Sequence, residues 1–216
     1  MVEKALNKRS PGRPQAFKPD EALDRAVEMF WTYGYERVDV DRIARAVNVT
    51  KPALYRAFGD KASLLIKAVQ RYTEVYGAPI MQRFLAEPDI DKAVRGFCEM
   101  TVYLGDGAGR AGCMMAAAAL GQSERVGDIR AFVAAALAES ANLISSRFQA
   151  EIDAGRLSAD IPAKVRGRAL IDLSQGIMLR TKLGVPREEL LEDALSYVPL
   201  ILAKPAKPIG RRRRIH

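Results

Sequence analysis

The stretch of sequence that decides the fold is VTKPALYRAFGDKASLL, residues 49–65. Its apolar spacing predicts two consecutive helices, the first over Lys51–Phe58 and the second over residues 61–76. Thr50 and Asp60 stand immediately before these helices, where a side-chain oxygen can accept hydrogen bonds from the first turn. This part of the chain is therefore predicted to consist of closely spaced, capped helices.

A shorter helix is predicted directly upstream, with Asp39 placed as its N-cap and an end at residue 47 or 48. Asn48 can adopt the left-handed backbone conformation that a tight turn between two helices needs. Residues 40–58 thus have the spacing of a helix-turn-helix, in which one helix braces on the phosphate backbone and the next enters the major groove. The apolar positions of the short helix are Val40, Ile43, Ala44 and Val47.

The predicted helix Lys51–Phe58 separates apolar from polar side chains. Leu54 and Phe58 can face a core, while hydroxyls and cations lie at the start and along one side of the helix. These polar side chains belong to Thr50, Lys51, Tyr55 and Arg56.

The rest of the chain has helical apolar spacing almost throughout. We expect a first helix over residues 19–33 with Gly34 as its C-cap, and no segment alternates as a strand. The fold class is therefore all-α. Further helices are predicted over residues 89–104, 112–122, 128–154, 163–183 and 187–203.

Positive charge is unevenly distributed along the 216 residues, whose formal net charge is +8. Residues 1–75 carry 14 basic and 10 acidic side chains, residues 76–203 carry 14 and 16, and residues 204–216 carry six and none. This pattern indicates that the two ends meet a polyanion and that the middle has another role. RNA or an anionic membrane surface would explain the charge, but neither explains the spacing of residues 40–58.

Several function classes are excluded by composition. The only histidine is His216, the last residue, so a His-based catalytic site inside the fold is ruled out. Cys98 and Cys113 alone supply neither a structural zinc site nor a disulfide framework, which favours a reducing cytosol. We therefore expect no enzymatic activity, no cofactor and no metal.

The chain also shows no targeting or membrane signal. Residues 1–10 are charged and lack the apolar core of a secretory signal. The longest uncharged stretch, residues 111–123, is 13 residues long and too short to span a bilayer. We expect a cytoplasmic protein without a membrane partner.

Several short motifs follow one another over residues 10–75. They are GRP at 12–14, AL..A...F at 22–30, GYE at 34–36, IA at 43–44 and VTKPALYRAFGDKASLL at 49–65. In their order and spacing, residues 10–75 resemble the N-terminal domain of TetR-family transcriptional regulators. Beyond residue 75 the resemblance extends only to helical character and length.

The resemblance implies a two-domain homodimer that binds a palindromic DNA operator. It implies a three-helix helix-turn-helix domain over residues 18–62 and an effector-binding and dimerisation domain over residues 63–203. Dimerisation would use the last two helices. A small-molecule effector would release a repressor from the operator, with the helix starting at Lys61 as the lever; an activator is the alternative. A flexible basic arm over residues 1–17 and a disordered basic tail over residues 204–216 complete the organisation, and the tail is more readily a solvated segment than a DNA contact.

Six side chains are predicted to meet the DNA by their position in the motif. Lys51 is the best candidate for a base edge because a cation there reaches guanine acceptors, although a phosphate contact is equally open. Tyr55 and Arg56 favour phosphates, and a half-buried structural ring is the alternative for Tyr55. Asp39 stands where the family often has Ser, and its carboxylate would repel a phosphate. The complete set is Arg13, Thr50, Lys51, Tyr55, Arg56 and Lys61.

The middle of the chain contributes candidate effector contacts, for which core packing is the default interpretation. Flexible methionine and aromatic side chains suit a pocket for an apolar ligand. Cys113 is a possible redox or electrophile sensor, but it has only Arg110 as a nearby cation in sequence, so a buried small hydrophobic role is favoured. The candidates are Phe97, Met100, Tyr103, Cys113, Met114 and Met178.

Overall fold

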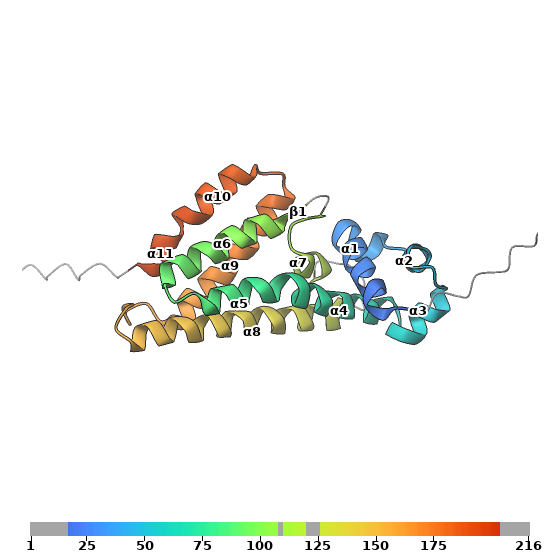
Figure 1. Ribbon diagram of the computed structural model, residues 1–216, viewed down its shortest axis with the longest axis horizontal. Coiled ribbons are helices and arrows are strands. Elements are labelled where there is room, and N and C mark those ends of the chain that lie inside the picture. Colours follow the sequence, from blue (N-terminus) through green and yellow to red (C-terminus); the bar gives the residue numbers. More distant parts are fainter. Residues whose placement is uncertain (1–16, 108–109, 120–125, 204–216) are drawn as a thin grey trace, which may run out of the picture.

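Helices alone build the body of the molecule, which is elongated, with the first three helices gathered at one end (Figure 1). The computed structural model describes residues 17–107, 110–119 and 126–203. The all-α prediction is confirmed, apart from one antiparallel ladder of two residues per strand. The elements are α1 Pro19–Arg37, α2 Val40–Ala46, α3 Lys51–Phe58, α4 Lys61–Tyr72, the π-helix η1 Thr73–Gly77, α5 Ala78–Ala86, α6 Ile90–Gly105, β1 Asp106–Gly107, β2 Arg110–Ala111, α7 Met114–Ala119, α8 Val126–Asp153, α9 Ala163–Lys182, α10 Arg187–Ser196 and α11 Val198–Leu202.

The three-helix head forms as the sequence predicts, with local capping at the expected positions. The Asp39 carboxylate accepts a hydrogen bond from the Asp41 backbone N–H at 2.9 Å, and the Asp60 carboxylate accepts one from Ser63. Asn48 has φ of 55°, the left-handed conformation expected of the inter-helix turn. Thr50 occupies the N-cap position, but its hydroxyl makes no capping hydrogen bond. The expectation for that hydroxyl was therefore wrong.

Helix α1 runs past its expected end. Gly34 has φ of 74° and breaks the regular helix where the C-cap was predicted, but one further turn follows up to Arg37. Tyr35 on this turn is buried against the head core and its ring stacks on Phe30 at 6.3 Å. Burial of that aromatic ring holds the extra turn in place.

The helix predicted over residues 61–76 ends at Tyr72 and continues as a π-helix into α5, which the sequence analysis did not anticipate. Pro79 explains the change, since it cannot donate to the carbonyl of Val75 and its ring would collide with that carbonyl in an α-helix. The wider π turn, in which the Ala78 N–H donates to the Thr73 carbonyl, accommodates it. Helices α4, η1 and α5 therefore follow one another without a loop.

Proline also divides the last predicted helix. Instead of one helix over residues 187–203, α10 ends at Ser196 and α11 begins at Val198, with Pro199 in its first turn. Proline is tolerated in the first turn of a helix but not in its interior, so the chain restarts there.

The second core lies between α5, α6, α8, α9, α10 and α11. Helices α8 and α9 pack along one another, and they approach closely at Gly167 of α9. A methyl group built on Gly167 would lie 2.8 Å from the Ala141 carbonyl oxygen and 2.9 Å from the Ser145 backbone nitrogen. Glycine is required here because another helix backbone occupies the space of a side chain.

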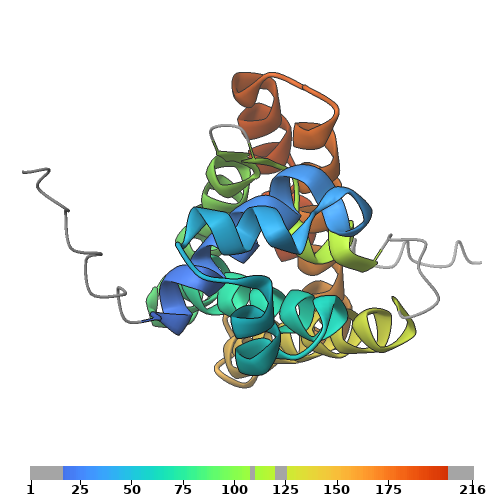
Figure 2. The ribbon, with the colours of Figure 1, turned by 90° about the vertical axis from the view of Figure 1, so that its right-hand side faces the viewer.

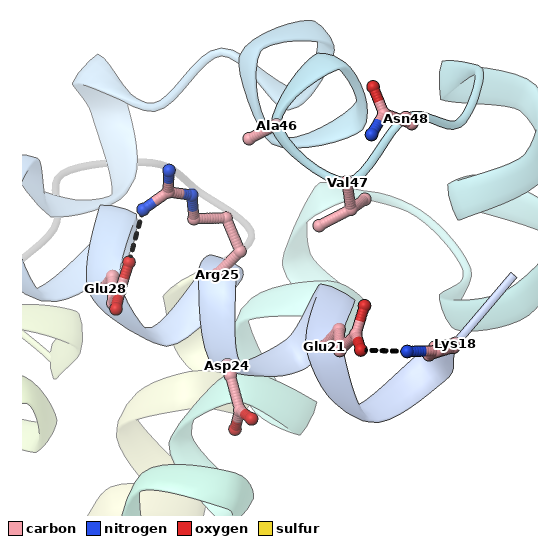
Figure 3. A pocket seen from close by; sticks show the side chains of 8 residues that line it. All are labelled: Lys18, Glu21, Asp24, Arg25, Glu28, Ala46, Val47 and Asn48. Carbon is pink, nitrogen blue, oxygen red and sulfur yellow. Dashed lines mark hydrogen bonds and ion pairs between the residues drawn. The ribbon is translucent and has the colours of Figure 1, made fainter. Parts of the chain in front are cut away.

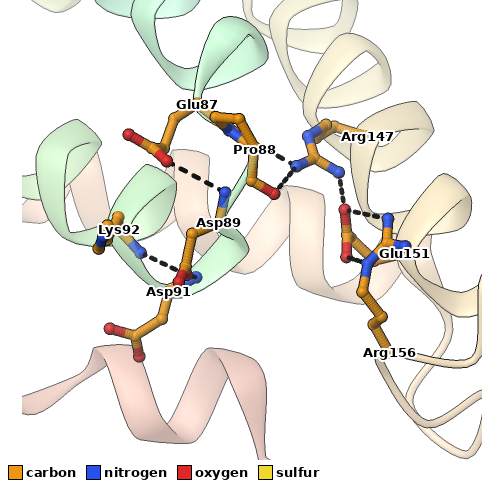
Figure 4. A network of polar contacts seen from close by, with 8 residues as sticks. All are labelled: Glu87, Pro88, Asp89, Asp91, Lys92, Arg147, Glu151 and Arg156. Atoms are coloured by element: carbon orange, nitrogen blue, oxygen red, sulfur yellow. Dashed lines mark hydrogen bonds and ion pairs between the residues drawn. The ribbon is translucent and has the colours of Figure 1, made fainter.

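A buried carboxylate fastens the end of α8 to the α5–α6 connection (Figure 4). Glu151 is fully buried, pairs with Arg147, and accepts hydrogen bonds from Arg156 at 2.5 and 3.0 Å. Arg147 also donates to the backbone carbonyls of Glu87 at 3.1 Å and Pro88 at 3.0 Å. Hydrogen bonds from Arg156 and then Arg147 hold the pKa of Glu151 at about 2, so the network stays charged at neutral pH.

Trp31, the only tryptophan of the chain, makes one of the contacts between the head and the segment that leads to α7. The Trp31 indole N–H of α1 donates to the Gly112 carbonyl at 2.8 Å, and Gly112 in turn lies close against the backbone of α9 at Met178. The Trp31 ring makes edge contacts with Tyr72 at 4.9 Å and Tyr76 at 5.3 Å. This one buried side chain therefore connects α1, to which it belongs, with the α4–η1 helix and with the segment leading to α7.

Candidate nucleic-acid interface

The α2–turn–α3 unit exposes the polar face that the sequence predicts, at the end of the molecule seen face-on in Figure 2. Leu54 and Phe58 are buried, and Thr50 and Arg56 are exposed. Within the described part of the chain, Arg56 forms no ion pair. The burial of one side of α3 leaves its other side available to a groove.

Lys51 is held by a carboxylate from the preceding helix. Its ammonium Nζ lies 3.0 Å from Asp41 Oδ2 and 5.8 Å from the centre of the Tyr55 ring. The hydrogen bond with Asp41, followed by the charge of Asp41, raises the pKa of Lys51, which keeps the ammonium charged. The motif placed Lys51 at the start of α3, but nothing in the sequence indicated its partner.

Tyr55 lies beside Lys51 on the exposed side of α3. Its side chain is 38% exposed, so it does not close the head core as a structural aromatic would. The Lys51 ammonium lies 5.8 Å from the ring centre, and a tyrosine hydroxyl on an exposed helix side is a donor of the kind that bonds phosphates.

Lys61 stands at the start of α4, as predicted, but it is less available than the motif suggests. Its ammonium lies 4.6 Å from the centre of the Tyr35 ring and 3.5 Å from the Glu36 carbonyl oxygen. Partial burial lowers the pKa of Lys61. The side chain therefore links the first turn of α4 to the last turn of α1.

Two arginines of α2 were missed by the sequence analysis. Arg42 and Arg45 are exposed, and the Arg42 guanidinium lies 5.0 Å from the centre of the Tyr33 ring. The available signal was that Arg42 and Arg45 flank the buried Ile43 and Ala44, since this position on the helix directs the two arginines away from the core. Both add positive charge to the helix that precedes α3.

A hollow of about 450 Å³ lies between α1 and the α2–α3 turn (Figure 3). Three carboxylates and two cations line it, and the cations are already paired. Lys18 binds Glu21 at 2.5 Å and Arg25 binds Glu28 at 2.5 Å. This mixed-charge surface is unsuited to a phosphate backbone, in contrast to the exposed side of α3.

Arg13, residues 1–16 of the predicted arm and the basic tail lie outside the described residues, whereas Phe17 is described and its ring centre lies 5.9 Å from that of Phe58. The six candidate effector contacts do not converge on one cavity. Phe97 packs in the second core, 5.8 Å from the Phe84 ring, whereas Met114 belongs to the core of the head. Tyr103 is 56% exposed, with the Arg187 guanidinium 5.4 Å from its ring centre, so it does not enclose a core as expected.

The remaining candidates have packing roles. Met178 is buried against Gly105 of α6, and Met100 is half-buried at the edge of the second core. Burial raises the pKa of Cys113, whose thiol interacts with Tyr72, and raises that of Cys98 to about 12. A raised thiol pKa lowers the fraction of reactive thiolate, which favours the packing interpretation of Cys113.

The described residues contain no metal-binding cluster of three or more His, Cys, Asp or Glu, and no helix among them is long and apolar enough to cross a bilayer.

Comparisons with known proteins agree with this geometry. Residues 22–68 match the family model described as bacterial regulatory proteins, tetR family. The repressor ComR of Escherichia coli K12 is 33% identical over 91 residues, and BdcR, a second repressor of that strain, is 29% identical over 116 residues. These matches cover 42% and 53% of this chain, but only 43% and 58% of the two relatives, so the chain matches about half of their length.

The structural similarity extends over the whole fold. A cysteine mutant of the regulator CifR, solved in complex with a 26-base-pair operator duplex, is 30% identical with a TM-score of 0.77. The similarity covers 85% of this chain and 98% of the CifR chain. The chain described here belongs to the TetR family of DNA-binding transcriptional regulators.

Proposed function

We propose that this protein is a repressor that binds a palindromic operator as a homodimer and is released by a small molecule bound to its C-terminal body. The exposed side of α3 carries the proposal, because its polar side chains lie opposite the buried Leu54 and Phe58. The names of ComR and BdcR support repression rather than activation. Thr50, Lys51, Tyr55 and Arg56 would contact DNA, with Lys61 and Arg13 as further contacts.

An apolar groove on the C-terminal body supports the homodimer. The groove has a volume of about 370 Å³ and lies between α9 and the α10–α11 segment. Leu200 and Val165 are 68% and 54% exposed there, which is unusual for large aliphatic side chains unless another surface covers them. Two copies related by a two-fold axis would bury the same face of each subunit. The other lining residues are Ile161, Arg166, Ala169, Leu173, Tyr197 and Ile201.

Arg166 keeps the floor of this groove rigid. It is 1% exposed and donates to the carbonyls of Ile161, Ser158, Ile201 and Ala203. These bonds fasten the end of α11 to α9, and burial lowers the pKa of the guanidinium. A preorganised apolar face loses little conformational entropy when it associates. Helix α9 and the α10–α11 segment therefore form the proposed dimer surface.

The DNA-binding part of the proposal is tested on a duplex selected by the wild-type protein from a random pool. We expect Tyr55→Phe to weaken binding about five- to tenfold for every sequence, because it removes a hydroxyl from a phosphate. Lys51→Ala should lose discrimination at one base pair, by about 1–3 kcal/mol. Titration of labelled duplex at fixed salt measures both effects.

Arg25→Ala is the matched control, since it removes a cation of the same domain that is paired with Glu28 in the mixed-charge hollow. Its affinity should change less than that of either α3 variant. If both α3 variants bind like wild type while deletion of residues 204–216 abolishes binding, the basic tail is the polyanion contact and the assignment of α3 is wrong.

Release by an effector requires that the head and the C-terminal body respond to one another. Trp31 supports this coupling, because its hydrogen bond to Gly112 and its contacts with Tyr72 and Tyr76 join the two parts. An effector that moves Gly112 would shift α1 and the end of α4, and with them the separation of the two α3 helices, which must match about 34–36 Å on DNA. Coupling is reciprocal, so DNA binding must also affect this junction.

Trp31 is the only tryptophan, so its fluorescence reports this junction directly. We expect the selected duplex to change the emission intensity or maximum of the wild-type protein, although Trp31 is buried inside the molecule. Trp31→Phe is the blank that identifies the signal. Binding confirmed by titration without any change in emission would contradict coupling through Trp31.

A further inference from the structure

The contact between Asp41 and Lys51 bridges the two helices of the helix-turn-helix. Asp41 lies in the first turn of α2 and Lys51 is the first residue of α3, and their charged atoms are 3.0 Å apart. The N-cap function in α2 is performed by Asp39, whose carboxylate accepts from the Asp41 backbone N–H. Capping of α2 therefore does not require the Asp41 carboxylate.

The ion pair contributes little to stability, because both side chains are more than one-third exposed. Exposed pairs of this kind are worth about 0–1 kcal/mol. The ion pair instead orients the Lys51 side chain. A lysine side chain is flexible, and the Asp41 carboxylate selects one position of its ammonium. The centre of the Tyr55 ring lies 5.8 Å from the same ammonium and is its second neighbour on α3. Lys51 is thus held between α2 and α3.

The Asp41 carboxylate also changes which acceptor Lys51 can meet. A phosphate that approaches the ammonium would be repelled by the Asp41 carboxylate 3.0 Å from it, and the negative charge of Asp39 also acts on Lys51. The O6 and N7 atoms of guanine are neutral acceptors and are not repelled in this way. Arg42, Arg45 and Arg56 are exposed in the same unit and remain available for phosphates.

We propose that Asp41 is a specificity-determining positioning residue, which holds the Lys51 ammonium by an ion pair so that Lys51 addresses a base edge, preferentially guanine, instead of a phosphate. This inference rests on the proposed function of α3. It assigns the choice between base and phosphate, which the position of Lys51 alone leaves open, to a residue of the preceding helix.

The test compares wild type with Asp41→Asn, which preserves the size of the side chain and removes its charge. Both proteins are titrated with the selected duplex and with duplexes altered one base pair at a time, at several salt concentrations. In the wild type, altering one particular base pair of each half-site should weaken binding. In Lys51→Ala, the same alteration should no longer weaken binding. In Asp41→Asn, discrimination at that base pair should fall about fivefold or more, while affinity for unrelated duplex rises.

The salt dependence gives a second, independent readout. A lysine released from Asp41 can neutralise a phosphate, so the slope of log affinity against log salt should become steeper by about one per subunit in Asp41→Asn. Combining Asp41→Asn with Lys51→Ala should remove both effects, because without Lys51 there is no ammonium to redirect.

Glu28→Gln is the matched control, since it removes one negative charge from the head at an ion pair of 2.5 Å far from α3 in sequence. It should leave base discrimination unchanged. Unfolding measurements should place Asp41→Asn within about 1 kcal/mol of wild type, which excludes a merely structural effect. The role of Asp41 alone would be overturned if Asp41→Asn left base discrimination and salt slope unchanged while Lys51→Ala had a clear effect. The proposed function itself would be overturned if neither Lys51→Ala nor Tyr55→Phe changed DNA binding.

Discussion

Gly167→Ala is expected to destabilise the protein by about 3 kcal/mol or more, because the added methyl group meets backbone atoms of another helix. The added Cβ would lie 2.2 Å from Ser145 Oγ, 2.8 Å from the Ala141 carbonyl oxygen and 2.9 Å from the Ser145 backbone nitrogen. A side chain can rotate away, but two of these three atoms belong to the backbone of α8. Helices α8 and α9 would have to separate, which disrupts the second core.

Gly96→Ala is the control for this prediction. Gly96 lies within α6, and the nearest atom to its added Cβ is the Arg83 Nε at 4.0 Å, an ordinary contact. Alanine is favoured over glycine inside a helix by about 1 kcal/mol, so this variant should be slightly more stable than wild type. Urea unfolding at one fixed chain concentration compares the two. Equal stability of Gly167→Ala and Gly96→Ala would show that α8 and α9 do not approach as closely as described.

Leu200→Asp is expected to convert the proposed dimer into a monomer. Leu200 is 68% exposed on the apolar groove, and two-fold symmetry places the substitution twice in one interface. Loss of about 1.5–3 kcal/mol for each leucine, with the added cost of burying a carboxylate, raises the dimer dissociation constant by a factor on the order of one hundred or more. Sedimentation velocity over a concentration series measures this shift.

Operator binding should fall together with dimerisation, because a monomer contacts one half-site and loses the gain from linking two. Leu85→Asp is the matched control, since Leu85 is also an exposed leucine, on α5 and outside the groove. It should remain dimeric and bind the duplex. A dimeric Leu200→Asp protein would place the interface elsewhere on the molecule.

The head could be predicted closely because its determinants are local. Helix α3 begins and ends at the predicted residues, and the caps at Asp39 and Asp60 and the left-handed Asn48 have the expected geometry. Each of these features depends on atoms within four residues of one another. The exceptions also have a local origin, since Pro79 and Pro199 were visible in the sequence but their effect on helix continuity was not taken into account.

The candidate site was predicted less completely than the helices. The motif identified Lys51, Tyr55 and Arg56, but not the carboxylate of Asp41 beside Lys51 or the Tyr35 ring beneath Lys61. These partners are separated by 10 and 26 positions, and the spacing of residues gives no distance across a turn between helices. The candidate effector contacts stay a prediction, and the structure divides these side chains between two cores and the surface.

The sequence by itself determined that this protein is helical and that residues 40–58 form a helix-turn-helix, because apolar periodicity and capping act over one or two turns. Only the tertiary structure decided which charges face one another, where α8 and α9 touch through Gly167, and that Trp31 reaches the Gly112 carbonyl. Those contacts join residues that are distant in the chain, and they form only when burial of two cores brings the helices together. The helix-turn-helix is therefore specified locally by the sequence. The proposed base selectivity, dimerisation and coupling between the head and the C-terminal body depend on the packed fold.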